Sequence, residues 1–207
     1  MDNGLAHLRV DLTKPAPEDL RDLFEAPVQT VCLEVGFGGG EHLLHRARDN
    51  PSIGFIGVEP FVTSMAKVVT AVVEEGLSNI RLYDDDAIKL LDWMPEASID
   101  LAYQLYPDPW PKKRHWKRRF INQQNVDRYA RVIKPGSEFR FASDIDTYVD
   151  WTLRHCRDHA SFQWTAQCAD DWRVPWHGWP GTRYEAKAFR EGRVPRYLTF
   201  LRKQSSD

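Results

Sequence analysis

Short apolar runs alternate with amphipathic segments along most of the chain. Apolar residues recur at positions 62, 65, 66, 69, 72 and 73, the spacing of one helix face, and Gly76 stands where such a helix would end. Compact apolar runs of strand length lie before and after this helix. The predicted strands are Val28–Val35, Ile53–Glu59, Ile80–Tyr83, Ile99–Leu105 and Phe139–Ala142, and the predicted helices are Glu41–Asn50, Val62–Val73, Val126–Ile133 and Ile145–Cys156.

This alternation predicts an α/β fold. Strand–helix–strand units require right-handed crossovers, so we expect a mostly parallel central sheet with helices on both faces. The end of the chain differs, because Phe162–Ala166 and Tyr197–Leu201 are strand-like and the Trp-, Pro- and Gly-rich loop between them predicts no full helix. The sheet should therefore close with an antiparallel C-terminal strand. Asp144 is placed to cap the helix that follows the fifth strand.

Length and composition indicate one folded domain. The chain has 207 residues, of which 42% are hydrophobic and 28% charged, enough to bury a core without a disulfide or metal. We expect residues 27–203 to form the domain, with a loosely held segment at 1–26 and a tail at 204–207. No run approaches the ~20 apolar residues of a membrane span, no signal peptide is evident, and the three cysteines form no CxxC pair. We expect a cytoplasmic protein with no membrane partner.

Glycines and carboxylates surround the end of the first predicted strand, where an α/β sheet binds its ligand. Gly36, Gly38 and Gly40 allow a ligand close to the backbone, and the next helix offers free N–H groups. A dinucleotide fingerprint would need glycine where this chain has Glu41, and the carboxylates of Glu34 and Glu41 would repel a pyrophosphate. The loop therefore favours a cationic ligand without phosphate, with ligand-free turn chemistry as the alternative.

Two further acidic positions suit a nucleoside. Glu59 follows the glycine loop by about twenty residues, where a carboxylate can accept hydrogen bonds from both ribose hydroxyls. Asp86 ends a run of three aspartates after the third strand, and one of them could receive an adenine amino group. Adjacent side chains on an extended segment point apart, so we expect no metal here, whereas helix capping by Asp86 is an alternative. The combination resembles the S-adenosylmethionine site of class I methyltransferases.

The fourth strand leads into a rigid loop and a run of cations. Prolines on both sides of Asp108 lock the backbone, and residues 112–119 carry six fixed positive charges although the net charge of the chain is −2. Cations bind phosphates, aromatic rings stack on bases, and a carboxylate accepts hydrogen bonds from a base edge. The pattern indicates a nucleic-acid site, with a rigid turn and a solvated charge run as the alternative.

Three motifs near this edge form a recognisable set. They are Pro107-Asp108-Pro109-Trp110, then Lys112-x-Arg114-His115-x-Lys117-Arg118-Arg119, and Thr182-Arg183-Tyr184-Glu185. Together they resemble the bacterial tRNA (guanine-N(7)-)-methyltransferase family over roughly Val31 to Arg202. The resemblance implies a Rossmann-like class I methyltransferase fold, S-adenosyl-L-methionine as methyl donor, and tRNA methylated at N7 of a variable-loop guanine, position 46. It implies neither a metal nor an obligatory protein partner.

The resemblance also implies residue roles. Asp108 would be the catalytic residue. The methyl donor would be contacted by Glu34, Gly36, Gly38, Gly40, Glu59, Asp86 and Asp108. The tRNA would be contacted by Lys112, Arg114, Lys117, Arg118, Arg119, Asp144, Thr182, Arg183, Tyr184 and Glu185.

The expected chemistry needs positioning and charge stabilisation. N7 of guanine carries its own lone pair, so no general base is required. Positive charge moves from sulfur to the base, and fixed carboxylates such as Asp108 and Asp144 would stabilise it. The alternatives are a non-catalytic RNA-binding subunit and a methyltransferase for another nucleic-acid or small-molecule target. The Trp-rich loop 172–179 either packs in the core or contacts RNA.

Overall fold

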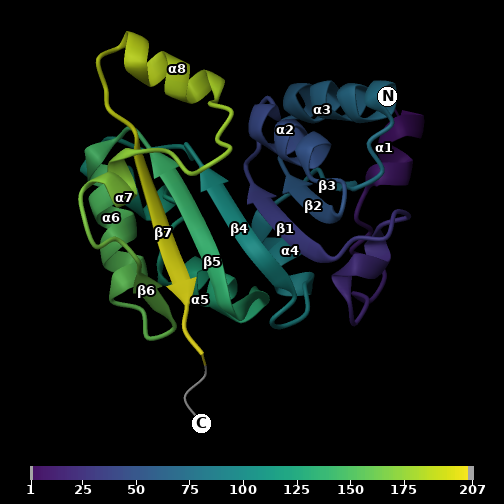
Figure 1. Ribbon diagram of the computed structural model, residues 1–207, viewed down its shortest axis with the longest axis horizontal. Coiled ribbons are helices and arrows are strands. Elements are labelled where there is room, and N and C mark those ends of the chain that lie inside the picture. The colour runs from purple at the N-terminus through teal and green to yellow at the C-terminus, as the bar shows by residue number, and fades with distance from the viewer. Residues whose placement is uncertain (1, 205–207) are drawn as a thin grey trace.

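The computed structural model describes residues 2–204 and contains a seven-stranded sheet surrounded by helices (Figure 1). The strands are β1 (Thr30–Val35), β2 (Ile53–Val58), β3 (Ile80–Tyr83), β4 (Ile99–Leu105), β5 (Ile133–Ser143), β6 (Phe162–Trp164) and β7 (Arg196–Arg202). The helices are α1 (Asp2–Leu8), α2 (Glu41–Asp49), α3 (Val62–Glu75), α4 (Ala87–Trp93), α5 (Gln123–Val132), α6 (Asp146–Arg157), α7 (Asp170–Arg173) and α8 (Arg183–Arg190), with 3-10 turns η1 (Leu20–Leu23) and η2 (Lys113–Arg118).

The strand order β3-β2-β1-β4-β5-β7-β6 confirms the predicted architecture. β1 to β5 are parallel, whereas β7 runs antiparallel between β5 and β6. The arrowheads of β4 and β5 point toward the end where α8 lies, and that of β7 points away (Figure 1). The order reverses between β1 and β4, which is where sheets of this kind bind ligands.

Apolar side chains fill the space between sheet and helices. One buried cluster includes Leu90, Tyr129 and Phe139, and another includes Leu43 and Val68. α3 ends as predicted, because Gly76 adopts a left-handed conformation with φ 65° and closes the helix. No helix within residues 2–204 is long and apolar enough to cross a membrane.

The N-terminal segment is packed, which corrects the expectation that residues 1–26 are loosely held. Val10 donates its N–H to the carbonyl of Leu82 at 2.8 Å, and Val10, Leu20 and Phe24 are buried in the core. Isolated apolar residues in a polar stretch give no periodic signal, so the sequence does not reveal these contacts. Met1 and residues 205–207 of the expected tail lie outside the described residues.

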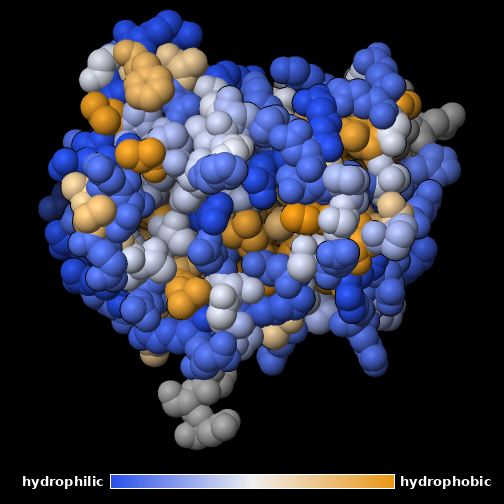
Figure 2. Space-filling model, viewed as in Figure 1, coloured by the Kyte–Doolittle hydropathy of each residue, from blue (hydrophilic) through white to orange (hydrophobic). Residues whose placement is uncertain are grey.

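The C-terminal loop contains a helix that the sequence analysis missed. α8 begins at Arg183, after Thr182, whose hydroxyl accepts the N–H of Glu185 at 3.1 Å. This Thr-x-x-Glu spacing is a helix-start signal. The surface over α8 mixes hydrophilic and apolar side chains (Figure 2), and Phe189 is 59% exposed. The predicted cap of α6 is also wrong, because Ile145 occupies that position and no side chain caps the helix.

Candidate active site

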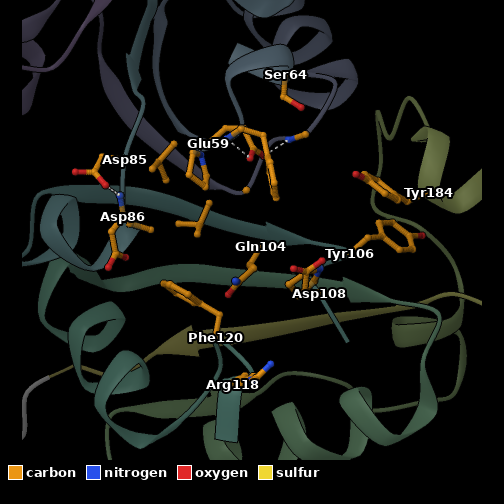
Figure 3. A pocket seen from close by; sticks show the side chains of 18 of the residues that line it. Glu59, Ser64, Asp85, Asp86, Gln104, Tyr106, Asp108, Arg118, Phe120 and Tyr184 are labelled. Atoms are coloured by element: carbon orange, nitrogen blue, oxygen red, sulfur yellow. Dashed lines mark hydrogen bonds between the residues drawn. The ribbon is translucent and has the colours of Figure 1, made fainter. Parts of the chain in front are cut away.

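A cleft of about 470 Å³ opens at the carboxyl ends of the parallel strands (Figure 3). Each of the first four strands contributes to it: Gly36 and Gly38 follow β1, Glu59 follows β2, Asp86 follows β3 and Asp108 follows β4. Asp86 lies at one end of the cleft and Asp108 at the other (Figure 3). The structure therefore brings these five residues together with Arg118 and Tyr184, all of which the sequence analysis selected.

The glycine loop after β1 leaves room for a ligand. Gly36 has φ 74°, and a Cβ atom added there would meet no atom within 4 Å. Gly38 has φ 54°, and its Cβ would lie 3.2 Å from the ring of Tyr184. Both conformations favour glycine, and the space at Gly36 lets a ligand approach the main chain.

Gly40 does not line the cleft, although it was expected to contact the methyl donor. It has φ 78°, and a Cβ atom would lie 2.3 Å from Cγ2 of Val68 on α3. Glycine at this position is therefore required for close packing of α2 against α3.

Glu59 joins two loops of the cleft through its carboxylate. One oxygen accepts the N–H of Gly38 at 2.8 Å, and the other accepts the N–H of Phe61 at 3.1 Å (Figure 3). The residue is 5% exposed. A carboxylate offers about four acceptor sites, so Glu59 keeps capacity for hydroxyl groups of a ligand.

The three aspartates after β3 have separate partners. Asp84 pairs with Arg9 at 2.9 Å, and Asp85 pairs with Lys89 at 2.6 Å. The hydrogen bond from Lys89 lowers the pKa of Asp85. Asp86 caps α4 by accepting a main-chain N–H at 2.9 Å while also lining the cleft. Capping and ligand contact are thus compatible roles for Asp86.

Glu34 lies beside the cleft. It lines a hollow of about 10 Å³ that also includes Thr182. One carboxylate oxygen of Glu34 lies 2.7 Å from Nδ1 of His42, a partner that the sequence analysis did not identify, and both side chains are buried. Tyr106 and Tyr184 line both the hollow and the cleft, and their rings stack at 6.4 Å. A contact from Glu34 to the donor stays a prediction.

Asp108 is exposed in a strained loop at the cleft. Tyr106 before it has φ 49°, and Trp110 after it has φ 43°. Left-handed conformations of non-glycine residues cost about 1–3 kcal/mol each and persist only where surrounding contacts enforce them. Contacts with other parts of the molecule must therefore hold the Pro107–Trp110 loop in this conformation.

The cations after this loop differ in exposure. Lys112, Arg114, Lys117 and Arg118 are exposed, as phosphate contact requires. Arg118 also lines the cleft, and its guanidinium lies 4.9 Å from the ring centre of Trp110. The basic surface and the cleft therefore share a side chain.

Arg119 is only 1% exposed, which corrects the expectation that it holds RNA. Its Nε donates to the carbonyl of Pro109 at 2.9 Å, while its terminal nitrogens donate to the carbonyl and hydroxyl oxygens of Thr147 at 2.8 and 3.0 Å. The guanidinium lies against three aromatic rings, those of Trp116, Tyr148 and Trp151. It cannot reach a phosphate from this position.

The remaining predicted substrate residues hold internal partners. Asp144 follows β5 and pairs with Arg193 at 2.5 Å. Glu185 is 7% exposed and accepts hydrogen bonds from Trp179 Nε1 at 2.9 and 3.0 Å and from the hydroxyl of Tyr197.

Within the segment 182–185, Tyr184 lines the large cleft. Thr182 caps α8 and lines the adjoining hollow. Arg183 is exposed, and its guanidinium lies 4.9 Å from the ring centre of Tyr184. This part of the predicted substrate site is thus close to the cleft but only partly directed into it.

The Trp-rich loop packs against the sheet. Trp176 and Trp179 are half-buried beside Tyr103 and Tyr197. Trp176 donates its indole N–H to the hydroxyl of Thr199 on β7 at 2.9 Å. Of the two interpretations, the structure favours core packing for these tryptophans.

Gln104 is a cleft residue that the sequence analysis missed. It lies near the end of β4, is 2% exposed, and accepts a hydrogen bond from the hydroxyl of Tyr129 at 3.2 Å. An amide within the otherwise apolar segment 101–105 of β4 is the signal that would have indicated it, because buried polar groups need partners.

The mostly parallel seven-stranded sheet with its antiparallel strand β7 is the fold of class I methyltransferases. The family described as "Putative methyltransferase" matches residues 28–196. The solved 16S rRNA methyltransferase KamB superposes with a TM-score of 0.61 at 16% identity, covering 86% of this chain and 90% of its own.

Two relatives are much closer in sequence. A protein of Mesorhizobium japonicum is 64% identical over 203 residues, which cover 98% of this chain and 87% of the relative. One of Agrobacterium fabrum is 62% identical over 203 residues, covering 98% and 88%. Both are named tRNA (guanine-N(7)-)-methyltransferase. The chain belongs to the tRNA (guanine-N(7)-)-methyltransferase family.

Proposed function

We propose that this chain transfers the methyl group of S-adenosyl-L-methionine to N7 of a guanine in tRNA, expected in the variable loop at position 46. One observation carries the proposal: Asp108 and Arg118 line the same cleft, and Arg118 belongs to an exposed basic run. The cleft proposed to bind the methyl donor thus lies next to the basic surface proposed to bind the phosphates of tRNA. The names of the relatives at 64 and 62% identity support this substrate.

The residues present fit the methyl donor. The space at Gly36 leaves the main chain accessible, and Glu59 and Asp86 offer carboxylate oxygens for ribose hydroxyls and an adenine amino group. S-adenosyl-L-methionine, when bound, supplies an electrophilic methyl group on a cationic sulfur. The acidic lining of the cleft suits that charge.

Asp108 would act by position and charge. Guanine N7 attacks with its own lone pair, so the enzyme need not remove a proton first. The purine gains positive charge as the methyl group arrives, and a fixed carboxylate stabilises that charge. The remaining contribution is to hold the base in line with the methyl group.

Substrate contact by Asp144 and Glu185 would require a change of partners. Asp144 is paired with Arg193, and the Glu185 carboxylate is held by Trp179 and Tyr197. We therefore expect the region around α8 to rearrange when tRNA binds. Glu59 and Asp86 on the donor side need no such exchange, because both already line the cleft.

The test is methyl transfer from labelled S-adenosyl-L-methionine to an unmodified tRNA transcript, followed by aniline cleavage at 7-methylguanine. Cleavage at one variable-loop guanine is the expected result. Label without cleavage would move the target to another atom, and binding of the donor without any label would contradict the proposal. Asp108→Asn should lower the single-turnover rate about a hundredfold, whereas Asp150→Asn on the outer face of α6 should not.

A further inference from the structure

We propose that Arg119 is a positioning residue for methyl transfer, an inference that rests on the function proposed above. Its guanidinium ties the Pro107–Trp110 loop to the first turn of α6 and thereby fixes the place of Asp108. The surrounding basic run hides this role, because Arg119 is the last of six cations in eight residues.

The loop cannot hold itself. Pro107 and Pro109 have no N–H group to donate, and the left-handed Tyr106 and Trp110 at its ends are unfavourable for non-glycine residues. The carbonyl of Pro109 receives its hydrogen bond from Arg119 Nε at 2.9 Å. External hydrogen bonding therefore takes the place of internal hydrogen bonding in this loop.

The guanidinium forms a two-ended bridge. One edge binds the loop at Pro109, and the two terminal nitrogens bind the carbonyl and hydroxyl of Thr147 on α6. This use of all three nitrogens depends on the planar fork of arginine, which the single ammonium of lysine lacks. Three aromatic rings, with centres 4.4 to 5.5 Å from the guanidinium carbon, pack against the fork and limit its movement.

The Arg119 bridge connects the two chain segments that carry the carboxylates of the proposed substrate site. Asp108 follows β4, and Asp144 follows the neighbouring β5, three residues before Thr147. By joining the β4 loop to α6, Arg119 sets how the segments that carry Asp108 and Asp144 lie relative to each other. Its neighbour Arg118 is exposed and makes no such bridge.

The kinetic test compares Arg119→Lys with Arg154→Lys, a matched change on the exposed face of α6. We expect Arg119→Lys to lower kcat at least tenfold, with the KM for tRNA and the salt dependence of tRNA binding unchanged, and Arg154→Lys to change none of these. A phosphate contact would instead reduce the log–log salt slope by roughly 0.7 to 0.9. That result, with kcat retained, would overturn the proposal.

A purely structural role is separated by a stability control. Val132→Ala opens a cavity beside the opposite end of the sheet, where Val132 is fully buried. The two variants are compared at an equal loss of melting temperature. If Arg119→Lys then lowers kcat no more than Val132→Ala does, a positioning role for Arg119 is refuted. Should Arg119→Lys fail to fold, Thr147→Val removes only the hydroxyl contact and should lower kcat about two- to fivefold.

Hydrogen exchange gives a readout that needs no activity. The Tyr106 amide, which donates to the carbonyl of Ala142 at 2.8 Å, should exchange faster in Arg119→Lys than in the wild type, while the amides of α3 keep their protection. Unchanged exchange in the loop would overturn the bridge. The loop amide could exchange faster in Arg119→Lys while the wild-type protein methylates no RNA. That combination would support the Arg119 bridge and refute the proposed function.

Discussion

The donor side of the cleft and the predicted substrate residues Asp144 and Glu185 beside it hold their charged groups by different means. On the donor side, Glu59 accepts main-chain N–H groups from two loops, and Asp86 caps the helix that follows it. On the substrate side, Asp144 is held by the side chain of Arg193, and Glu185 by the side chains of Trp179 and Tyr197. Main-chain donors are fixed by the fold, whereas side-chain partners can exchange. The donor side is thus preorganised, and the substrate side can rearrange.

The largest effect should come from Gly40→Ala. The new Cβ would lie 2.3 Å from Val68 at a φ of 78°, so strain and overpacking should lower the free energy of unfolding by about 2–4 kcal/mol. Chemical denaturation measures this. Gly76→Ala is the matched control, because its left-handed φ is similar but its Cβ would meet nothing within 4 Å. Equal losses in both variants would contradict a packing role for Gly40.

Glu59→Ala should weaken binding of the methyl donor. The N–H groups of Gly38 and Phe61 would lose their acceptor, at a cost of about 1–3 kcal/mol in the free energy of unfolding. The Kd for S-adenosyl-L-methionine, measured by calorimetry, should rise at least tenfold, while tRNA binding without donor stays unchanged. Loss of tRNA binding in the folded variant would show that the two sides are not separate.

Tyr197→Phe should affect the substrate side alone. The variant removes one donor to Glu185 and should lower the free energy of unfolding by about 0.5–1.5 kcal/mol. Burial raises the pKa of Tyr197, and the Glu185 hydrogen bond raises it further, so the hydroxyl remains a donor at neutral pH. Donor affinity should not change. A weaker Kd for S-adenosyl-L-methionine would contradict the separation.

Lys117→Ala should give the smallest effect. An exposed phosphate contact contributes through counterion release, so the log–log salt slope of tRNA binding should fall by roughly 0.7 to 0.9. The KM for tRNA should rise severalfold, and kcat should stay within a factor of two. A loss confined to kcat would place Lys117 with Arg119 rather than with the RNA-binding cations.

That Gly36, Glu59 and Asp86 line one cleft could be predicted from the sequence, because the signals that place them are local. Gly36 and Glu59 stand directly after β1 and β2, Asp86 lies three residues after the end of β3, and parallel strands bring such ends together. Arg119 could not be recognised as buried, because its partners Thr147 and Tyr148 lie far along the chain on α6. Contacts between side chains that are far apart in the sequence produce no periodic pattern of apolar and polar residues.

Asp144 shows the same limit. Its position before α6 predicts a helix cap from local spacing alone, yet the carboxylate turns to Arg193, 49 residues away. The ion pair with Arg193, which is distant in sequence, is thus formed in place of a hydrogen bond from the Asp144 carboxylate to the first turn of α6. The packed N-terminal segment was missed for the same reason, since Val10 bonds to Leu82 on β3, and β1 and β2 lie between the two residues in the sequence.

The position of β7 has a consequence for how the protein is made. β7 is the last strand in the sequence, yet it lies between β5 and β6 and buries Leu198 and Phe200. A ribosome must therefore release β7 before this part of the sheet can close. β1, β2 and β3 can pair much earlier in synthesis. The nascent chain would therefore pair β1, β2 and β3 first and complete the β5-β7-β6 part of the sheet only after β7 has been made.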